Sequence, residues 1–372
     1  MTMLIMDGNQ AAAWGAYFAG CRFFAGYPLT PATSIYNTML DLLPKSGGVV
    51  VQAEDEIASI GMCLGASMAG NKAMTATSGP GLSLFSENLS FAVGSEIPLV
   101  IVNVQRQGPS TGSATRGADG DIQFMRWGNS GGMPLIVLCP VNAPDCLALT
   151  MQAFNLAETY RCPVIVASNK EVGLTEESID FDAIEKPDVI GRRAPMSGGE
   201  IFPFTPLPGA DVPGFLPIGH ETLVRNTSST HGEKGYIITE PDDIQNMISR
   251  MDRKIEAHVD EFTFYEHHDE PGADTLMITY GVTSRAALEA IKKLKAGGRA
   301  VSHLILKTLW PVPANTILKA AAGKKRVVMA EMNMGQYVRE IERVVKGVSI
   351  DFLGQMNGKL ISPEQIAALI EK

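Results

Sequence analysis

Residues 49–81, VVVQAEDEIASIGMCLGASMAGNKAMTATSGPG, decide the fold. The β-branched run at 49–52 and the apolar run at 73–77 predict two buried strands, because each is short and bounded by polar residues or glycine. The stretch between them, 55–68, predicts a helix. Alternation of strand and helix implies parallel pairing, so we expect a parallel sheet covered by helices on both faces.

The same alternation continues on both sides of this stretch and predicts a domain at residues 1–180. Its further elements are a helix at 143–160 and strands at 21–24, 99–104, 135–139 and 164–167. Residues 181–271 differ in character. Six prolines between 195 and 217 prevent regular structure, so we expect an extended arm that ends in a polar helix at 242–258.

A second, smaller α/β domain is predicted at 272–372. Its elements are a helix at 284–294 and strands at 275–280, 301–306 and 326–330. The run HHDE at 267–270 is interpreted as a solvated linker rather than a metal site, because nothing else nearby has ligand spacing.

The composition of the 372 residues excludes several classes of function. A net charge of −9 argues against nucleic acid as a partner, since phosphate binding needs clustered Lys and Arg. No stretch has the roughly 20 apolar residues of a membrane span, and the start of the chain lacks the basic region of a signal peptide. The five cysteines never form C-x-x-C, so we expect buried thiols in a reducing compartment, the cytoplasm.

Two glycine- and proline-rich turns follow predicted strands, at the edge where open α/β sheets bind ligands. The loop GYPLTPAT at 26–33 either presents hydroxyls to a ligand or only joins a strand to a helix that Thr30 or Thr33 caps. The turn TSGPG at 77–81 is either a tight turn or a backbone-lined wall for a flat ligand.

The helix that opens with EDE at 54–56 has two unusual features. Acids in a first turn are favoured by the helix dipole, but three acids directly after a buried strand also suggest that one faces inward. Gly61, Gly65 and Ala69 recur every four residues and share one helix face. A face without side chains lets another backbone approach closely.

The long loop at 105–121 carries Arg116 at its centre. A loop of this length is usually functional or disordered. Its guanidinium is either an exposed charge or the partner of a substrate carboxylate. The chain has no phosphate-binding G-x-x-x-x-G-K-[ST] loop, no H-E-x-x-H, no G-x-S-x-G and no convincing nicotinamide-binding pattern.

In combination these motifs resemble the α subunit of 2-oxoacid:ferredoxin oxidoreductases. The tract YPLTPAT at 27–33 is close to that family's YPITPST. GPSTG at 108–112, followed by Arg116 and then by Gly120-Asp121, is similar to its substrate loop. The glycine-containing helix looks like the pyrimidine-binding helix of thiamine enzymes. The unit at 279–317 is similar to the transketolase C-terminal domain. The resemblance implies an α/β fold with a pyrimidine-type thiamine-diphosphate domain and a transketolase C-terminal-like domain.

The resemblance also implies roles for single residues. Glu56 stands where the family has the glutamate that bonds the aminopyrimidine ring and so promotes removal of the thiazolium C2 proton. Thr30 and Arg116 match the residues that hold the substrate carboxylate, and Tyr27 lies in the same motif at the substrate. The residues implied at the cofactor are Pro28, Ser78 and Gly79.

A second chain is implied as well. This chain has no G-D-G motif for Mg²⁺ and diphosphate, and its cysteines lack the spacing for an iron–sulfur cluster, so both are expected on a smaller β subunit. We expect thiamine diphosphate shared between the two chains of a heterodimer, within an α2β2 or larger assembly with ferredoxin-like subunits. Coenzyme A is the expected co-substrate and ferredoxin the expected electron acceptor.

The expected reaction is the oxidative decarboxylation of a 2-oxo acid to its acyl-CoA. The substrate predicted is 2-oxoglutarate, because EDEIAS at 54–59 and TATSGPG with the following Glu-Asn within 75–88 resemble that branch most closely. Its distal carboxylate needs a cation, for which the candidates are Arg22, Lys72, Arg106 and Arg126. The alternatives are a branched-chain, pyruvate or aryl substrate, the transketolase-like β chain of a lipoamide-linked 2-oxo acid dehydrogenase, or an inert assembly subunit.

Overall fold

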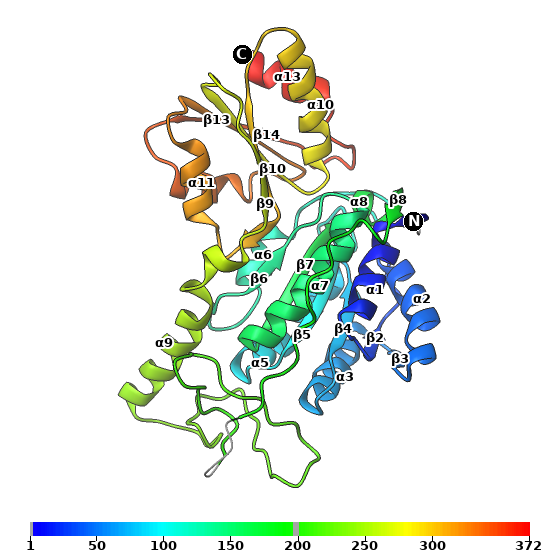
Figure 1. The fold of residues 1–372 in the computed structure, drawn as a ribbon, viewed down its shortest axis with the longest axis vertical. Coiled ribbons are helices and arrows are strands. Elements are labelled where there is room, and N and C mark those ends of the chain that lie inside the picture. Colours follow the sequence, from blue (N-terminus) through cyan, green and yellow to red (C-terminus); the bar gives the residue numbers. More distant parts are fainter. Residues whose placement is uncertain (1–2, 196–200) are drawn as a thin grey trace.

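A seven-stranded sheet forms the centre of the first half of the computed structural model, which describes residues 3–195 and 201–372 (Figure 1). Its order is β12-β6-β7-β5-β4-β2-β3, and every pairing is parallel except that of β12 with β6. The strands are β2 (Phe23–Gly26), β3 (Val49–Gln52), β4 (Ala73–Thr77), β5 (Leu99–Gln105), β6 (Ile136–Leu138), β7 (Pro163–Asn169) and β12 (Thr308–Trp310). The predicted parallel sheet is confirmed.

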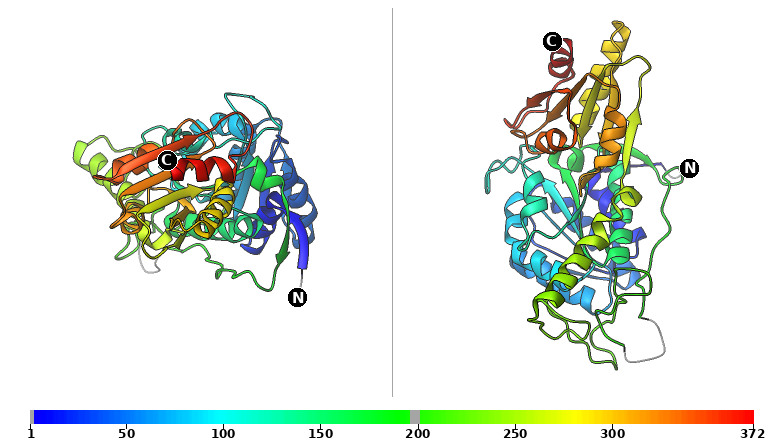
Figure 2. Two further views of the ribbon diagram at one scale, coloured as in Figure 1. Left: turned by 90° about the horizontal axis from the view of Figure 1, so that it is seen from above. Right: turned by 90° about the vertical axis from the view of Figure 1, so that its left-hand side faces the viewer.

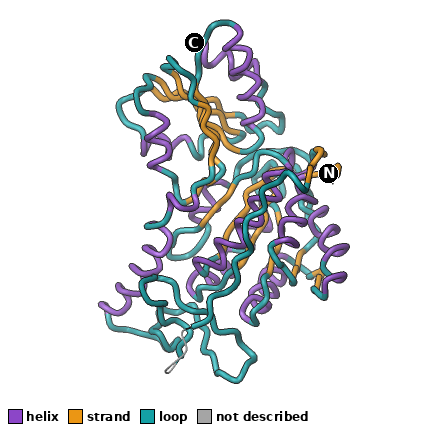
Figure 3. The backbone as a smooth tube through the Cα atoms, viewed as in Figure 1, coloured by secondary structure: helices purple, strands orange, loops and turns teal. Residues whose placement is uncertain are grey.

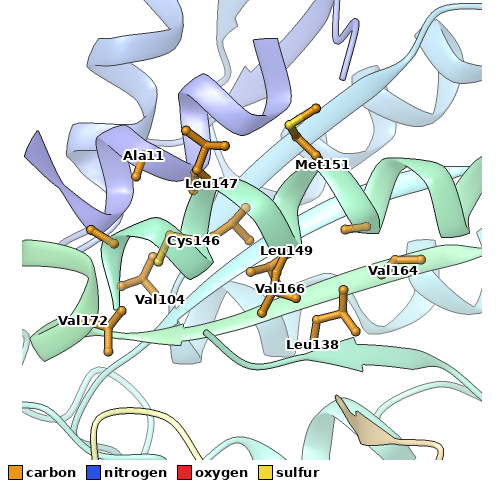
Figure 4. Close-up of a cluster of buried hydrophobic side chains, with 14 of the residues drawn as sticks. Ala11, Val104, Leu138, Cys146, Leu147, Leu149, Met151, Val164, Val166 and Val172 are labelled. Atoms are coloured by element: carbon orange, nitrogen blue, oxygen red, sulfur yellow. The ribbon is translucent and has the colours of Figure 1, made fainter. Parts of the chain in front are cut away.

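Helices cover both faces of this sheet. One face carries α1 (Gly8–Phe18), α2 (Thr33–Leu42) and α7 (Ala143–Tyr160), and the other α3 (Glu56–Met68), α4 (Gly79–Leu84), α5 (Ser86–Gly94) and α6 (Ile122–Trp127). Along β5, Val100, Val102 and Val104 join the core beneath α1 and α7, whereas Leu99 and Ile101 join the core beneath α3 and α5. Figure 4 shows Val104 in the first of these cores, near Cys146 of α7. Coverage on both faces explains why every residue of β5 is buried.

A small antiparallel ribbon adds to this domain. It pairs β1 (Met3–Asp7) with β8 (Glu176–Asp180), which follows the short helix α8 (Lys170–Leu174). Neither strand of this ribbon was predicted from the sequence.

The arm, residues 181–240, has neither helix nor strand in its described part and runs along the amino-terminal end of the sheet strands (Figures 1 and 3). It leads into α9 (Pro241–Glu256) and the short helix η2 (Val259–Phe262). Arg161 holds the arm by donating to the carbonyl oxygens of Pro203 and Gly214, each at 2.9 Å. An extended segment is thereby ordered by side-chain hydrogen bonds to its backbone.

A buried ion cluster ties α9 to the sheet domain. The carboxylate of Glu96 lies 2.7 Å from Lys254 Nζ and 2.6 Å from Arg250 Nη2. Burial acts to raise the pKa of Glu96, but these two cations outweigh burial and hold its pKa well below the usual range. The charge is therefore paired on both sides, as a buried carboxylate requires.

The C-terminal unit is a five-stranded sheet in the order β14-β13-β10-β11-β9, and it lies over one end of the larger sheet (Figure 2). Its strands are β9 (Tyr265–His268), β10 (Thr275–Tyr280), β11 (Ser302–Leu306), β13 (Arg326–Glu331) and β14 (Ser349–Gly354), all parallel except β9. Its helices are α10 (Thr283–Ala296), α11 (Ala314–Ala321), α12 (Val338–Val344) and α13 (Pro363–Glu371).

Most predicted elements are confirmed, and two interpretations are wrong. The strand at 49–52 was expected to be buried, but β3 lies at the edge of the sheet and has no buried residue, because only β2 pairs with it. The strands at 49–52, 73–77 and 275–280 and the helix at 143–160 match the structure at both ends. His267 and His268 belong to β9 and pair with β11, so they are not part of a linker. The division of the chain at 180 and 271 stays a prediction.

Two expectations from composition can be compared with the structure. All five cysteines are free and buried, as predicted. Within residues 3–195 and 201–372, no helix combines the length and the hydropathy needed to cross a membrane.

Candidate functional site

The carboxyl ends of three neighbouring strands, β2, β4 and β5, lie at the edge of the larger sheet that faces the C-terminal unit (Figure 1). The YPLTPA loop (27–32) follows β2, a turn at Ser78 follows β4, and the loop 106–121, called the substrate loop below, follows β5. α3 begins beside them, after β3. The three segments that the sequence singled out therefore meet at one edge.

Glu56 is the acid of the EDE run that faces inward. It is the first residue of α3, and Asp55 before it caps the helix by accepting from the N–H of Ala58 at 2.7 Å. Glu56 is 8% exposed, whereas Glu54 and Asp55 are exposed. Because Asp55 makes the cap, the Glu56 carboxylate is available for another partner. The prediction that one acid faces inward is confirmed.

Three hydroxyls near the TSGPG turn are buried and unpaired. The side-chain oxygens of Thr75, Thr77 and Ser78 have no hydrogen-bond partner among the described residues. An unpaired buried polar group costs about 1–3 kcal/mol. A β-carbon built on Gly81 would contact both Thr77 and Glu56, so the turn brings a hydroxyl and the inward carboxylate together. This arrangement suits a ligand with several hydrogen-bonding groups.

Arg106 joins the two loops that the sequence assigned to the substrate. It follows β5, is 5% exposed, and its guanidinium donates to the carbonyl oxygens of Thr30 at 2.5 Å and Thr111 at 3.0 Å. Burial lowers the pKa of Arg106, and the carboxylates of Asp121 and Glu56 oppose that shift. Its Nε has no partner in the part of the chain that the structure describes. Arg106 therefore fixes both loops, while its Nε stays free to donate to a ligand.

Asp121 is a second inward carboxylate, for which no role was predicted from the sequence although it belongs to the matched loop. Its Oδ2 accepts from Asn103 Nδ2 at 3.1 Å, and its backbone N–H donates to Gln105 Oε1 at 3.0 Å. Burial raises the pKa of Asp121, while Asn103 and Arg106 lower it. A β-carbon on Gly79 would lie 3.7 Å from Oδ2. Polar residues at the end of an otherwise apolar buried strand were the available signal.

The residues predicted to bind the substrate, Tyr27, Thr30 and Arg116, lie at the mouth of the site, together with Pro28, which was predicted at the cofactor. Thr30 and Arg116 are exposed, Tyr27 is 40% exposed, and Pro28 is half-buried. No hydrogen bond links Arg116 to Thr30 within the described segments. Arg116 packs instead on the C-terminal unit, because a β-carbon on Gly358 would lie 2.9 Å from Cβ of Arg116. The roles of these four residues stay predictions.

The YPLTPA loop does not cap α2 with a threonine. Ala32 is the N-cap residue and makes no side-chain capping bond, so the alternative that Thr30 or Thr33 caps this helix is wrong. The loop is anchored from α1, where Asn9 Nδ2 donates to the carbonyl oxygen of Pro31 at 2.8 Å.

Three of the four cations considered for a distal substrate carboxylate lie elsewhere. Lys72, just before β4, donates to the carbonyl oxygen of Ile190 at 2.6 Å. Arg22 precedes β2, so it also lies at the amino-terminal end of the strands. Arg126 in α6 donates to the carbonyl oxygen of Gly132 at 3.0 Å. Of the four, only the cation at the end of β5 joins the loops of the site.

Known protein families define the class to which this fold and site belong. Residues 14–250 match the model described as pyruvate flavodoxin/ferredoxin oxidoreductase, thiamine diphosphate-binding. Residues 273–366 match the model described as pyruvate:ferredoxin oxidoreductase core domain II. Together these matches cover most of the chain and define a thiamine-diphosphate-binding oxidoreductase.

Individual relatives narrow the class. The chain is 40% identical to the 2-oxoglutarate synthase subunit KorA of Methanothermobacter marburgensis, and the match covers 97% of this chain and 96% of that subunit. The chain is 31% identical to the ketoisovalerate oxidoreductase subunit VorB of Methanothermobacter thermautotrophicus, and the match covers 100% of this chain and 98% of that subunit. The chain belongs to the family of 2-oxoacid:ferredoxin oxidoreductase α subunits, and it is more similar to KorA than to VorB.

Solved structures agree. The 2-oxoglutarate:ferredoxin oxidoreductase from Magnetococcus marinus, with 2-oxoglutarate, coenzyme A and succinyl-CoA bound, superposes with a TM-score of 0.93 at 35% identity; the match covers 99% of this chain and 65% of that one. A split-gene transketolase, an inactive β4 tetramer, has a TM-score of 0.57 at 13% identity and shows the fold alone. The predicted fold class is confirmed, and the relatives favour the ferredoxin-linked family over a lipoamide-linked β chain.

Proposed function

We propose that this chain is the α subunit of an enzyme that oxidatively decarboxylates 2-oxoglutarate to succinyl-CoA and passes the electrons to ferredoxin. The observation that carries the proposal is the inward carboxylate of Glu56 beside the unpaired hydroxyls of Thr77 and Ser78, at the carboxyl edge of the sheet. The chain also has 38–40% identity to four 2-oxoglutarate synthase subunits.

Thiamine diphosphate fits these residues, because its aminopyrimidine ring carries hydrogen-bonding groups along one edge. When bound, the cofactor supplies carbanion stabilisation next to the substrate carbonyl. Glu56 would hold a proton at the pyrimidine ring, with Pro28, Ser78 and Gly79 lining the ring's pocket. A carboxylate in this place works as a general acid–base group, and burial on α3 fixes its direction.

Arg106 and the two loops that it joins would bind the 2-oxo acid. Thr30 and Arg116 would hold the carboxylate next to the ketone, with Tyr27 covering the mouth. Arg106 donates to backbone carbonyl oxygens of both the YPLTPA loop and the substrate loop, so it fixes the distance between the two loops before the substrate binds. Such preorganisation orients the reacting carbon and helps to exclude water.

A β subunit would complete the site with Mg²⁺ and an iron–sulfur cluster, in an α2β2 or larger assembly with ferredoxin-like subunits. Among residues 3–195 and 201–372, no three His, Cys, Asp or Glu side chains are grouped to hold a metal ion. A β-carbon built on Gly61 or Gly65 of α3 would have no described atom within 4 Å, so this helix face is open to a partner's backbone. Coenzyme A and ferredoxin remain the proposed co-substrate and acceptor, in the cytoplasm.

Expression with and without the product of the neighbouring gene tests this proposal. The chain alone should be colourless, bind no iron and reduce no artificial acceptor with 2-oxoglutarate and coenzyme A. The co-expressed complex should contain iron and thiamine diphosphate and turn over. Stoichiometric iron or turnover in the single chain would refute the two-subunit site, and a complex without thiamine diphosphate would refute the assignment of the cofactor.

A further inference from the structure

The backbone at the end of the substrate loop is held by the C-terminal unit. The N–H of Asp119 donates to the carbonyl oxygen of Met332 at 2.9 Å. In return, Asn333 Nδ2 donates to the carbonyl oxygen of Asp119 at 2.9 Å. Gln336 Nε2 donates to the carbonyl oxygen of Gly120 at 2.6 Å. Backbone groups of two successive loop residues are therefore satisfied by residues more than 200 positions later.

Asn333 is oriented by its own domain. It is fully buried, and its Nδ2 also lies 2.9 Å from the hydroxyl of Tyr280 and 2.9 Å from Glu331 Oε2. Its Oδ1 accepts from the N–H groups of Gly335 at 2.9 Å and Gln336 at 3.0 Å. Both ends of the amide are thus used within the C-terminal unit, so the donor to the loop is rigidly aimed.

A second contact closes over the same loop. β-Carbons built on Gly358 and Gly120 would lie 2.9 Å from Cβ of Arg116 and 2.8 Å from Cε of Met356, respectively. The carbonyl oxygen of Arg116 accepts from the N–H of Gln107 at 2.8 Å, which closes the loop on itself. The place of Arg116 therefore depends on the loop's own bonds and on the C-terminal unit.

We propose that Asn333 and Gln336 are positioning residues of the active site, which fix the backbone of Asp119 and Gly120 and through it the place of Arg116. This rests on the proposed role of Arg116 at the substrate carboxylate. The C-terminal unit then acts on substrate binding without contacting the substrate. Fixing a loop before binding removes its ordering entropy from the cost of association.

The test uses Gln336→Glu and Asn333→Asp in the complex with its partner subunit. Gln336→Glu keeps the side chain's size and its acceptor but removes the donor to Gly120. Asn333→Asp removes the buried donor, and Gln336→Glu covers the case in which that variant fails to fold, because Gln336 is only half-buried. The matched control is Met334→Ala, in the same segment and 73% exposed.

Two readouts separate positioning from general stability. In hydrogen exchange of the folded complex, Gln336→Glu should speed exchange of the peptide 107–121 and leave α3 as in the control. The KM for 2-oxoglutarate should rise about tenfold, while exchange of the cofactor C2 proton stays within about twofold, because Glu56 lies on an element that this contact does not include. The proposal would be overturned if Gln336→Glu impaired exchange of the cofactor C2 proton as much as it impaired use of 2-oxoglutarate. It would also be overturned if hydrogen exchange of the peptide 107–121 were unchanged.

Arg116→Ala completes the test as a double-mutant cycle. If Gln336 acts through Arg116, adding Gln336→Glu to Arg116→Ala should change KM by less than about twofold, and a full additive effect overturns the proposal. If Arg116→Ala alone leaves KM unchanged, the role of Arg116 in the proposed function fails instead. Hydrogen exchange of 107–121 then decides whether Asn333 and Gln336 hold the loop.

Discussion

A β-carbon added to Gly81 would lie 2.7 Å from Cγ of Glu56 and 2.9 Å from its Oε1. It would lie closer still to the hydroxyl oxygen of Thr77. The missing side chain at position 81 therefore leaves room for the inward carboxylate in its observed direction. The TSGPG turn therefore contributes to the site in two ways: its hydroxyls line the site, and the absence of a β-carbon at Gly81 leaves space for Glu56.

Gly81→Ala should lower kcat in the assembled enzyme by about 100-fold, because the methyl group displaces Glu56 and small displacements at a reacting group are costly. The control is Gly191→Ala, where the added carbon meets no described atom within 4 Å. Steady-state rates, with thermal unfolding to confirm folding, give the answer. Wild-type turnover in Gly81→Ala would mean that the direction of Glu56 does not matter.

Glu56→Gln should keep the fold and abolish turnover with every 2-oxo acid. Glutamine preserves the shape and removes the proton acceptor, and such groups contribute about 100- to 10,000-fold. Deuterium exchange at the cofactor C2 position measures the step directly. Glu54→Gln changes an exposed neighbour and should exchange normally. Should Glu56→Gln exchange at the wild-type rate, Glu54 becomes the next candidate.

Glu96→Gln should destabilise the protein by roughly 3–5 kcal/mol, because it leaves the buried ammonium of Lys254 without its counter-charge. The pKa of Glu96 is held low in the folded state, so its contribution is present above the ordinary carboxyl range and is lost as pH falls. Urea unfolding at neutral pH measures the loss. Asp211→Asn, whose partner Arg253 is exposed, should cost much less, and equal costs would contradict the argument.

Asp119→Asn should change the pH dependence of stability. Burial, with smaller contributions from Glu331, Asp121 and Glu171, raises the pKa of Asp119 from 3.8 to about 7, against a hydrogen bond from Asn169. Between those values the folded chain binds more protons than the unfolded chain, so this group's contribution to stability falls as pH rises.

The asparagine variant cannot titrate, so relative to the wild type it should gain on the order of 2 kcal/mol between pH 5 and pH 8. Denaturant midpoints of both proteins across this range test the sign. A constant difference at every pH would show that Asp119 is ionised throughout.

Some of the fold followed from the sequence because it depends on local pattern. β3 and α7 were predicted to the residue, since a β-branched run favours a strand and an uninterrupted 18-residue stretch without internal glycine favours a helix. β12 has three residues, and the pairing of β1 with β8 joins segments more than 160 positions apart. Short strands of this kind are stabilised by tertiary pairing, which leaves little periodicity to read.

The site divides in the same way. The inward direction of Glu56 could be anticipated because three acids follow a strand and Asp55 is available as a cap, although the strand itself, β3, lies at the sheet edge and is not buried. The bridging role of Arg106 could not, because its partners are backbone carbonyl oxygens of Thr30 and Thr111, and any residue has a carbonyl. The same holds for Asn333, whose contact with the loop is also to a carbonyl oxygen. A sequence shows which side chains can donate a hydrogen bond, but it does not show which backbone carbonyl oxygen will accept it.

The prediction of 2-oxoglutarate as the substrate depends on which cation can pair with its distal carboxylate. A 2-oxo acid places one carboxylate next to the ketone, so discrimination must come from the distal end. Both terminal nitrogens of Arg106 already bond the loops, and only its Nε is unpaired within the described residues. The distal carboxylate therefore needs Arg106 Nε or a second N–H of its terminal nitrogens, a donor on the partner subunit, or both. A hydrophobic substrate tail would leave such donors buried and unpaired, which is costly.

The assembled enzyme should prefer 2-oxoglutarate over pyruvate and 2-oxoisovalerate by at least about tenfold in kcat/KM, a difference of roughly 1.4 kcal/mol. Competition between the three acids, with the acyl-CoA products quantified, measures this ratio. Arg106→Lys keeps the charge but cannot bond both loops, so it should raise KM for all three acids while the control Met334→Ala leaves them unchanged. Equal use of the three acids, or a preference for the branched one, would refute the 2-oxoglutarate assignment. The family membership would still hold, because it rests on similarity over the whole chain, whereas the substrate assignment rests on a few donors at one end of the site.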